Sequence, residues 1–226
     1  MTGTPPNPQL LRSLGKLVRG LSALFWGLPA ALLAGATAAQ VEWLKPLGFL
    51  PLLAVNGMLC YGLSQLGDFQ PQERPWRATL DRARLLGWVN LGLCPFIYWH
   101  HRAPAEPCFA VECVLGECAA ALLLYQLNTV LQRLGAMLPD ETLRQETRQF
   151  TVLNKWLLTG LLAAVAIAGA GLEAVHVGKL SGRHLDGLVQ AGEAGAMLLL
   201  LVPLTMTMAL LWKTKEVILD GVFGPR

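Results

Sequence analysis

Residues 21–39 read LSALFWGLPAALLAGATAA, a continuous apolar run that contains no charged side chain. About twenty consecutive apolar residues form an α-helix long enough to cross the roughly 30 Å hydrocarbon core of a bilayer. Arg12, Lys16 and Arg19 precede this run at spacings of four and three, which places them on one side of a helix that leads into it. The sequence therefore predicts a first transmembrane helix at 21–39 with a basic helical lead-in.

A cleaved signal peptide is the alternative interpretation of residues 1–38. A basic segment, an apolar core and the small residues Ala36-Thr37-Ala38 also resemble a signal sequence and its cleavage site. The length of the run and the second apolar run that begins at 47 favour a helical hairpin instead.

Five further apolar runs follow, and together they predict an all-α, polytopic transmembrane helical bundle arranged as three hairpins. The predicted bundle occupies 21–212, with spans at 21–39, 47–66, 85–99, 108–131, 156–175 and 188–212. The run at 85–99 gives only about 22 Å of helix, so whether it crosses fully is left open. The longer connections are 67–84 and 132–155, and the tails are 1–20 and 213–226.

The basic residues are distributed unevenly between the predicted loops. Fourteen of the eighteen Lys and Arg residues lie in the two tails and the two longer connections, and four lie in the other three connections. Short basic loops are retained on the cytoplasmic side, so both termini are predicted to be cytoplasmic in a bacterial inner membrane. This face would suit anionic lipid headgroups.

Overall composition agrees with lipid as the solvent for most of the surface. The chain is 54% hydrophobic and 15% charged, with a mean hydropathy of +0.45, whereas soluble domains carry about 25% charged residues. Trp43 and Trp99 fall at predicted outer span ends, and Trp156 and Trp212 at inner ends, where amphipathic rings are favoured. The sequence contains no soluble segment in which basic residues cluster with aromatic ones, so nucleic-acid binding is not predicted.

Small residues at helical spacing predict where the helices approach each other, because close backbone contact holds helices together in lipid. These predicted packing faces are Gly27, Ala31, Gly35 and Ala39 in the first span, and Gly160, Ala164 and Ala168 in the fifth. Asn56, Asn90 and Asn128 place an amide in the second, third and fourth spans, and we expect them to bond between helices. Pro203 lies within the sixth span and predicts a kink.

Ionisable residues within or beside the spans gather toward the predicted outer side. They are Glu112, Glu117, Glu173, Glu193, His101 and His176. One interpretation is an outward-facing polar vestibule that binds a cation, a metal or a proton, with Glu117 deepest in the membrane. The other is that these groups lie at the interface and have a structural role only. Their spacing matches no known metal-ligand motif, so metal binding stays open.

Enzyme signatures are missing from the chain. It contains no GxSxG motif, P-loop or GxGxxG motif, and no cofactor is predicted. The five cysteines include no CxxC pair, which argues against a disulfide framework or a zinc module. We therefore expect a non-enzymatic integral membrane protein, an accessory or assembly subunit that acts by helix packing, either as a homo-oligomer or within a larger complex. The alternative is a small-solute or cation permease centred on Glu117, and an intramembrane enzyme is a third interpretation.

Overall fold

The computed structural model of the chain describes residues 8–37, 46–70, 72–103, 106–138, 140–176 and 183–223. Within these ranges the side chains are described except at 8–10, 36, 101, 107, 110, 165–176, 183–199, 222 and 223. The described ranges form six long α-helices, so the predicted all-α class is confirmed. They are α1 (Pro8–Thr37), α2 (Leu50–Gln65), α3 (Arg74–Arg102), α4 (Pro107–Met137), α5 (Glu141–His176) and α6 (Arg183–Phe223), with a short 3-10 turn, η2 (Leu66–Asp68), after α2.

Helix starts follow local sequence. Proline occupies one of the first two positions of α2, α3 and α4, where a missing N–H costs nothing and the fixed φ suits a helix. At the start of α5, Oδ1 of Asp140 accepts hydrogen bonds from the backbone N–H groups of Thr142 at 2.9 Å and Leu143 at 3.1 Å. Asp140 thus caps the first turn of α5 with a negative charge at the positive end of the helix dipole.

The helices pack as a closed ring. Each helix contacts the next one along the chain, α6 returns to contact α1, and α4 contacts α6 across the ring. The rings of Phe25 on α1 and Trp212 on α6 lie 5.5 Å apart at this closure. Buried leucines from every helix form one continuous core, with Leu17, Leu21 and Leu63 on one side and Leu127, Leu134 and Leu158 on the other.

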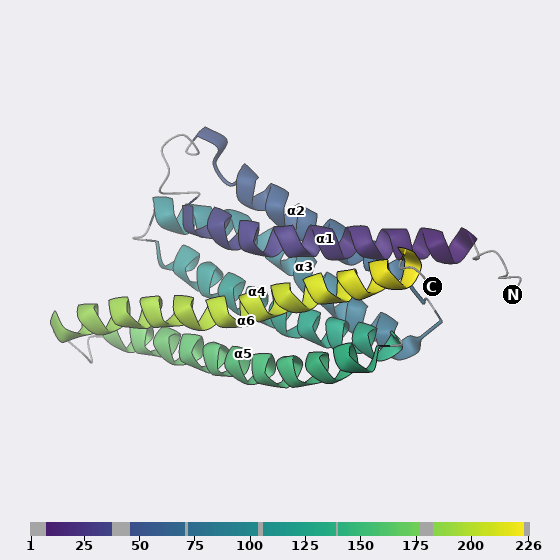
Figure 1. Cartoon of the computed structure of the whole chain (residues 1–226). Helices are drawn as coiled ribbons and strands as arrows, with labels where there is room; N and C mark the ends of the chain where they lie inside the picture. The colour runs from purple at the N-terminus through teal and green to yellow at the C-terminus, as the bar shows by residue number, and fades with distance from the viewer. Residues whose placement is uncertain are drawn as a thin grey trace, which may run out of the picture.

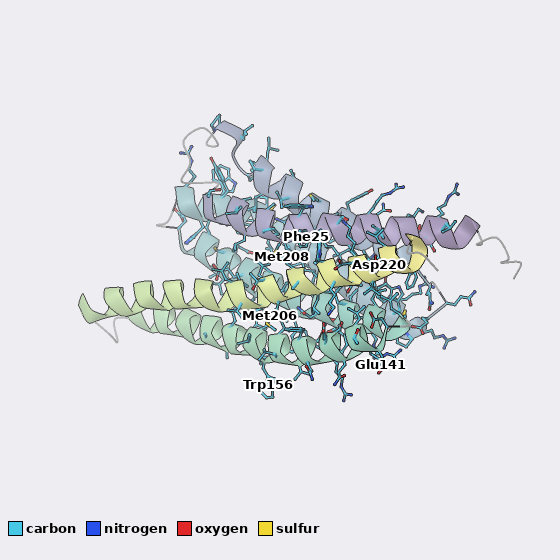
Figure 2. All side chains as sticks on the ribbon, in the orientation of Figure 1. Phe25, Glu141, Trp156, Met206, Met208 and Asp220 are labelled. Atoms are coloured by element: carbon cyan, nitrogen blue, oxygen red, sulfur yellow. The ribbon has the colours of Figure 1, made fainter. Side chains whose placement is uncertain are left out.

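Successive helices run in opposite directions (Figure 1), so the chain ends and alternate turns share one end of the bundle. We call this the terminal end: α1 begins there, α2 passes to α3, α4 passes to α5, and α6 ends. Glu141 and Asp220 mark it in Figure 2. The described parts of the segments that carry most of the basic residues therefore meet at the terminal end, and Arg226 lies outside the described residues.

The connections 67–84 and 132–155 are largely helical. Helix α3 runs without interruption from Arg74 through the 85–99 segment, and α4 continues to Met137 before α5 begins at Glu141. Helix α1 likewise joins the basic lead-in to the first apolar run, and α6 extends the last run to Phe223. The helices therefore continue beyond the apolar runs at the terminal end.

Two segments of the described chain are long and apolar enough to cross a membrane, Leu11–Gly35 and Val111–Met137. The core helix of a soluble protein and an N-terminal signal sequence meet the same criterion of length and composition. A six-helix bundle is thus shown, whereas six membrane crossings are not established by these two segments.

Candidate functional site

The most distinctive interior feature is a group of buried polar side chains between α4, α5 and α6. Asn128 lies on α4, Thr151 and Asn154 on α5, and Thr207 on α6, and each of the four side chains has no exposed surface. We call these four residues the polar cluster. Polar groups are rarely buried without hydrogen bonds, so their geometry indicates what they do.

Asn154 connects all three helices. Its Nδ2 atom lies 2.9 Å from Oδ1 of Asn128 on α4, and on α6 it lies 3.1 Å from the carbonyl oxygen of Pro203 and 3.0 Å from Oγ1 of Thr207. Nδ2 of Asn128 lies 2.9 Å from Oγ1 of Thr207 as well. The two amides and one hydroxyl therefore form a network of direct bonds between helices.

Helix α6 contributes the backbone carbonyl of Pro203 to this network. The N–H that proline lacks would have bonded the carbonyl of Leu199, one turn earlier, so it does not account for the side-chain donors at Pro203 itself. The hydroxyl of Thr207 donates to the Pro203 carbonyl at 2.7 Å, and the hydroxyl of Thr205 donates to the carbonyl of Val202 at 2.9 Å. Helix α6 continues on both sides of the proline.

Buried polar side chains continue along the interface between α5 and α6, from the polar cluster toward the terminal end. Thr147 on α5 and Thr214 on α6 are buried, at 1% and 0% exposure. Among the described atoms, Oδ1 of Asn154 and the hydroxyls of these two threonines have no hydrogen-bond partner. Near the terminal end, Lys213 of α6 pairs with Glu146 of α5. The interface between α5 and α6 is thus polar over several turns, which joins these helices by bonds as well as by apolar packing.

The three asparagines predicted to bond between helices differ in what they do. Asn128 belongs to the polar cluster. In contrast, Nδ2 of Asn56 and Nδ2 of Asn90 each donate to the carbonyl four residues earlier in the same helix, Leu52 and Leu86, at 2.9 Å. All three asparagines are buried.

Asn154 and Thr207 were not predicted as partners of Asn128. A signal existed, because Leu143, Thr147, Thr151 and Asn154 recur at spacings of four, four and three and so share one face of α5. This face is buried in the structure, whereas Phe150 and Leu153 beside it are exposed. Because this face combines leucine with threonine and asparagine and lies in a polar connection, its apolar character is too weak to identify it as a core face from the sequence.

The ionisable group predicted as a vestibule is only partly described. Glu117 lies on an exposed part of α4, and Glu112 one turn earlier is half-buried. The side chains of His101, Glu173, His176 and Glu193 lie outside the described residues. Where side chains are described, no three His, Cys, Asp or Glu residues are arranged to hold a metal ion.

The small-residue faces also divide. A methyl group at Gly27 would meet Leu59 of α2 at 2.7 Å, and Ala31 packs against the core. A methyl group added at Gly35 or at Gly160 would have no atom of another described helix within 4 Å, and Ala164 is exposed. The side chains of Ala39 and Ala168 lie outside the described set. The small residues of α5 therefore face outward where they are described.

The backbones of α1 and α2 approach closely at two glycines that were not predicted as packing residues. A methyl group on Gly20 of α1 would lie 2.8 Å from the carbonyl oxygen of Gly62 on α2, and one on Gly62 would lie 3.1 Å from the carbonyl of Gly20. Gly62 belongs to no regular small-residue repeat in α2. Gly20, in contrast, lies three residues before Ala23 and seven before Gly27, so it continues the small-residue face predicted for the first span.

Comparison with protein family models, with curated proteins and with solved structures finds no match to this chain.

Proposed function

We propose that this chain is an integral membrane protein whose six helices cross the bilayer and whose role is assembly through helix packing. The observation that supports this most strongly is exposed apolar surface on every helix. A soluble monomer rarely exposes contiguous apolar patches larger than a few hundred Å². Large exposed hydrophobic residues on the six helices include Trp26, Leu33, Leu50, Tyr61, Leu85, Trp88, Val111, Leu115, Val152, Trp156, Leu201 and Val202.

The charge distribution supports an orientation. Segments rich in Lys and Arg converge on the terminal end, and side chains there form ion pairs, Lys16 with Asp68 and Arg144 with Glu141. In a bilayer this end would face the cytoplasm, because positive loops are retained there. We therefore infer cytoplasmic chain termini in a bacterial inner membrane.

The interior supports packing as the mode of action. The polar cluster bonds to itself and to the backbone carbonyls of Leu124, Asn128 and Pro203. This arrangement suits a structural joint between α4, α5 and α6. Glu117, around which a permease would be centred, lies on an exposed part of α4. These placements favour an assembly subunit over a transport pathway.

A face of α5 is available for a partner helix. Thr159, Gly160, Ala163 and Ala164 are exposed, and no described atom lies within 4 Å of a methyl group built at Gly160. Small residues at a helix surface allow close approach of another helix in lipid. We propose that a second copy or a partner subunit packs here.

Two measurements test the proposal. Alkaline carbonate extraction should leave the full-length protein in the membrane pellet, and release into the supernatant would contradict membrane integration. Native gel electrophoresis in a mild detergent should then show a complex larger than one chain. The double variant Gly160→Leu/Ala164→Leu should reduce it to single chains, whereas Gly92→Leu, at an exposed glycine of α3, should leave it intact. A complex unaffected by the α5 variant would refute the proposed interface.

A further inference from the structure

The outer surface of α5 carries a shallow hollow near the terminal end. Its lining residues all belong to one face of that helix, and they are Gln145, Arg148, Gln149, Val152, Leu153 and Trp156. Trp156 is 74% exposed, the largest value among the exposed large hydrophobic residues. Figure 2 shows its ring projecting from α5 away from the other helices. This side chain therefore has no role in the core of the bundle.

The lining changes from polar to apolar along the helix. Gln145, Arg148 and Gln149 lie toward the start of α5, and Val152, Leu153 and Trp156 follow over the next two turns. Eleven residues separate the first and last of these, a rise of about 16 Å. A phospholipid has the same order and a comparable scale, with a polar headgroup followed by an acyl chain.

The charge in the hollow is unbalanced. Arg144 pairs with Glu141, and Lys213 pairs with Glu146. Arg148, in contrast, forms no ion pair with any acidic side chain whose position is described. Two turns further along α5, and outside the lining of the hollow, Lys155 also has no acidic partner in the described chain. Its Nζ lies 5.1 Å from the centroid of the Tyr125 ring. An anion would find unneutralised positive charge here.

We propose that this hollow binds an anionic phospholipid. Its phosphate would contact the guanidinium of Arg148 and the amides of Gln145 and Gln149, and one acyl chain would lie along Val152, Leu153 and Trp156. Arginine suits this role because its planar donors match phosphate oxygens. Tryptophan is favoured at the level of the headgroups, where one edge is apolar and the other is wet.

The inference rests on the proposed membrane location and orientation, and it adds a specific site to them. A peptide ligand would need acidic and apolar groups in the same order along 16 Å, whereas a bilayer leaflet presents this order by itself. The site lies between the terminal end and the small-residue face at Gly160 and Ala164. A bound lipid would therefore border the proposed assembly surface.

Native mass spectrometry of the full-length, delipidated protein in detergent tests the site. Phosphatidylglycerol and phosphatidylcholine with identical acyl chains are added in separate titrations. We expect one phosphatidylglycerol to be retained in preference to phosphatidylcholine, and Arg148→Gln to weaken that retention about fivefold. Trp156→Ala should weaken both lipids alike, and millimolar inorganic phosphate should not displace the lipid.

Arg77→Gln is the matched control, since Arg77 is an exposed arginine of α3 with no acidic partner in the described chain. It should leave phosphatidylglycerol retention unchanged. Equal retention of the two lipids, or equal weakening by Arg148→Gln and Arg77→Gln, would overturn the site while leaving membrane integration standing. Release of the protein by carbonate would instead remove the proposed function itself.

Discussion

Nδ2 of Asn154 on α5 lies 2.9 Å from Oδ1 of Asn128 on α4. Both side chains are fully buried, and the same nitrogen also reaches the Pro203 carbonyl on α6. These hydrogen bonds fix how the three helices are rotated relative to one another. If any one of them rotated about its own axis, a buried polar group would lose its hydrogen-bond partner.

Asn154→Leu should destabilise the bundle by about 1–3 kcal/mol, because it leaves Oδ1 of Asn128 buried without its donor. Asn56→Leu is the matched control, since the Asn56 amide bonds only to the carbonyl of Leu52 in its own helix. The control should change stability clearly less. Unfolding in increasing mole fractions of sodium dodecyl sulfate, followed by circular dichroism, measures both variants. Equal losses for the two would contradict a structural joint at Asn154.

Gly20→Ala should destabilise the contact between α1 and α2 by about 1–3 kcal/mol, as is typical of overpacking. The added methyl would lie 2.5 Å from the side chain of Leu66 and 2.8 Å from the carbonyl oxygen of Gly62. Gly15→Ala, in the same helix but with open space around it, should be neutral or stabilising by up to about 1 kcal/mol. Thermal unfolding of the two variants in detergent distinguishes them. A tolerated Gly20→Ala would show that the two helices do not cross at this point.

The helices themselves could be predicted because the length of an apolar run and the charged residues that interrupt it are properties of neighbouring residues in the sequence. The lead-in at Arg12–Arg19 joins the first apolar run within one helix, α1, as predicted. The start of α5 likewise depends on local bonds, from the backbone N–H groups of Thr142 and Leu143 to Asp140. These features depend on residues close in sequence, so they were accessible without a structure.

The contacts between helices were harder to predict, because they depend on the tilt and rotation of each helix. Gly27 and Gly35 share one small-residue face, yet only Gly27 contacts α2 closely. Asn56, Asn90 and Asn128 look alike in sequence. Of the three, only the Asn128 side chain bonds to two other helices, accepting from Asn154 of α5 and donating to Thr207 of α6. The spacing of residues along one helix does not specify the angle at which two helices cross, so these residues could not be distinguished from the sequence.

Asp140 should make stability depend on pH in the acidic range. Hydrogen bonds from the Thr142 hydroxyl and then from the Leu143 backbone N–H hold the pKa of Asp140 below its ordinary value of 3.8. A carboxyl with a lowered pKa in the folded state stabilises the fold above the ordinary value, and this stabilisation is lost as the pH falls through the folded pKa. Asp140→Ala should therefore lower the melting temperature by roughly 2–4 °C at pH 7, with a smaller effect at pH 3.

Asp140→Asn is the control for the cap, because its side-chain oxygen still accepts the two backbone N–H groups but cannot titrate. It should retain most of the melting temperature at pH 7 and show less dependence on acid. An alanine variant with the same melting temperature as the parent at pH 7 would show that Asp140 does not stabilise the start of α5.

Lys155 should make stability depend on pH in the alkaline range. Burial, and secondarily the positive charge of Arg133, lowers the pKa of Lys155 below its ordinary value of 10.5. The folded state therefore binds fewer protons than the unfolded state between the two pKa values, and stability should rise as the pH increases toward 10.5. Lys155→Met should abolish this rise without loss of the bundle at pH 7. Urea or dodecyl sulfate titrations at pH 8 and pH 10 measure the difference, and parallel curves for parent and variant would contradict it.

The membrane topology is tested most directly by truncating the chain at chosen residues and fusing a dual reporter to each truncation point. The reporter has two enzymatic activities, one that works only in the cytoplasm and one that works only in the periplasm. Fusion after residue 140, at the terminal end, should give cytoplasmic activity, and fusion after residue 103, at the opposite end of the bundle, should give periplasmic activity. The same compartment for both fusions, or periplasmic activity for the fusion after 140, would contradict a bundle that crosses the bilayer with its basic end inside.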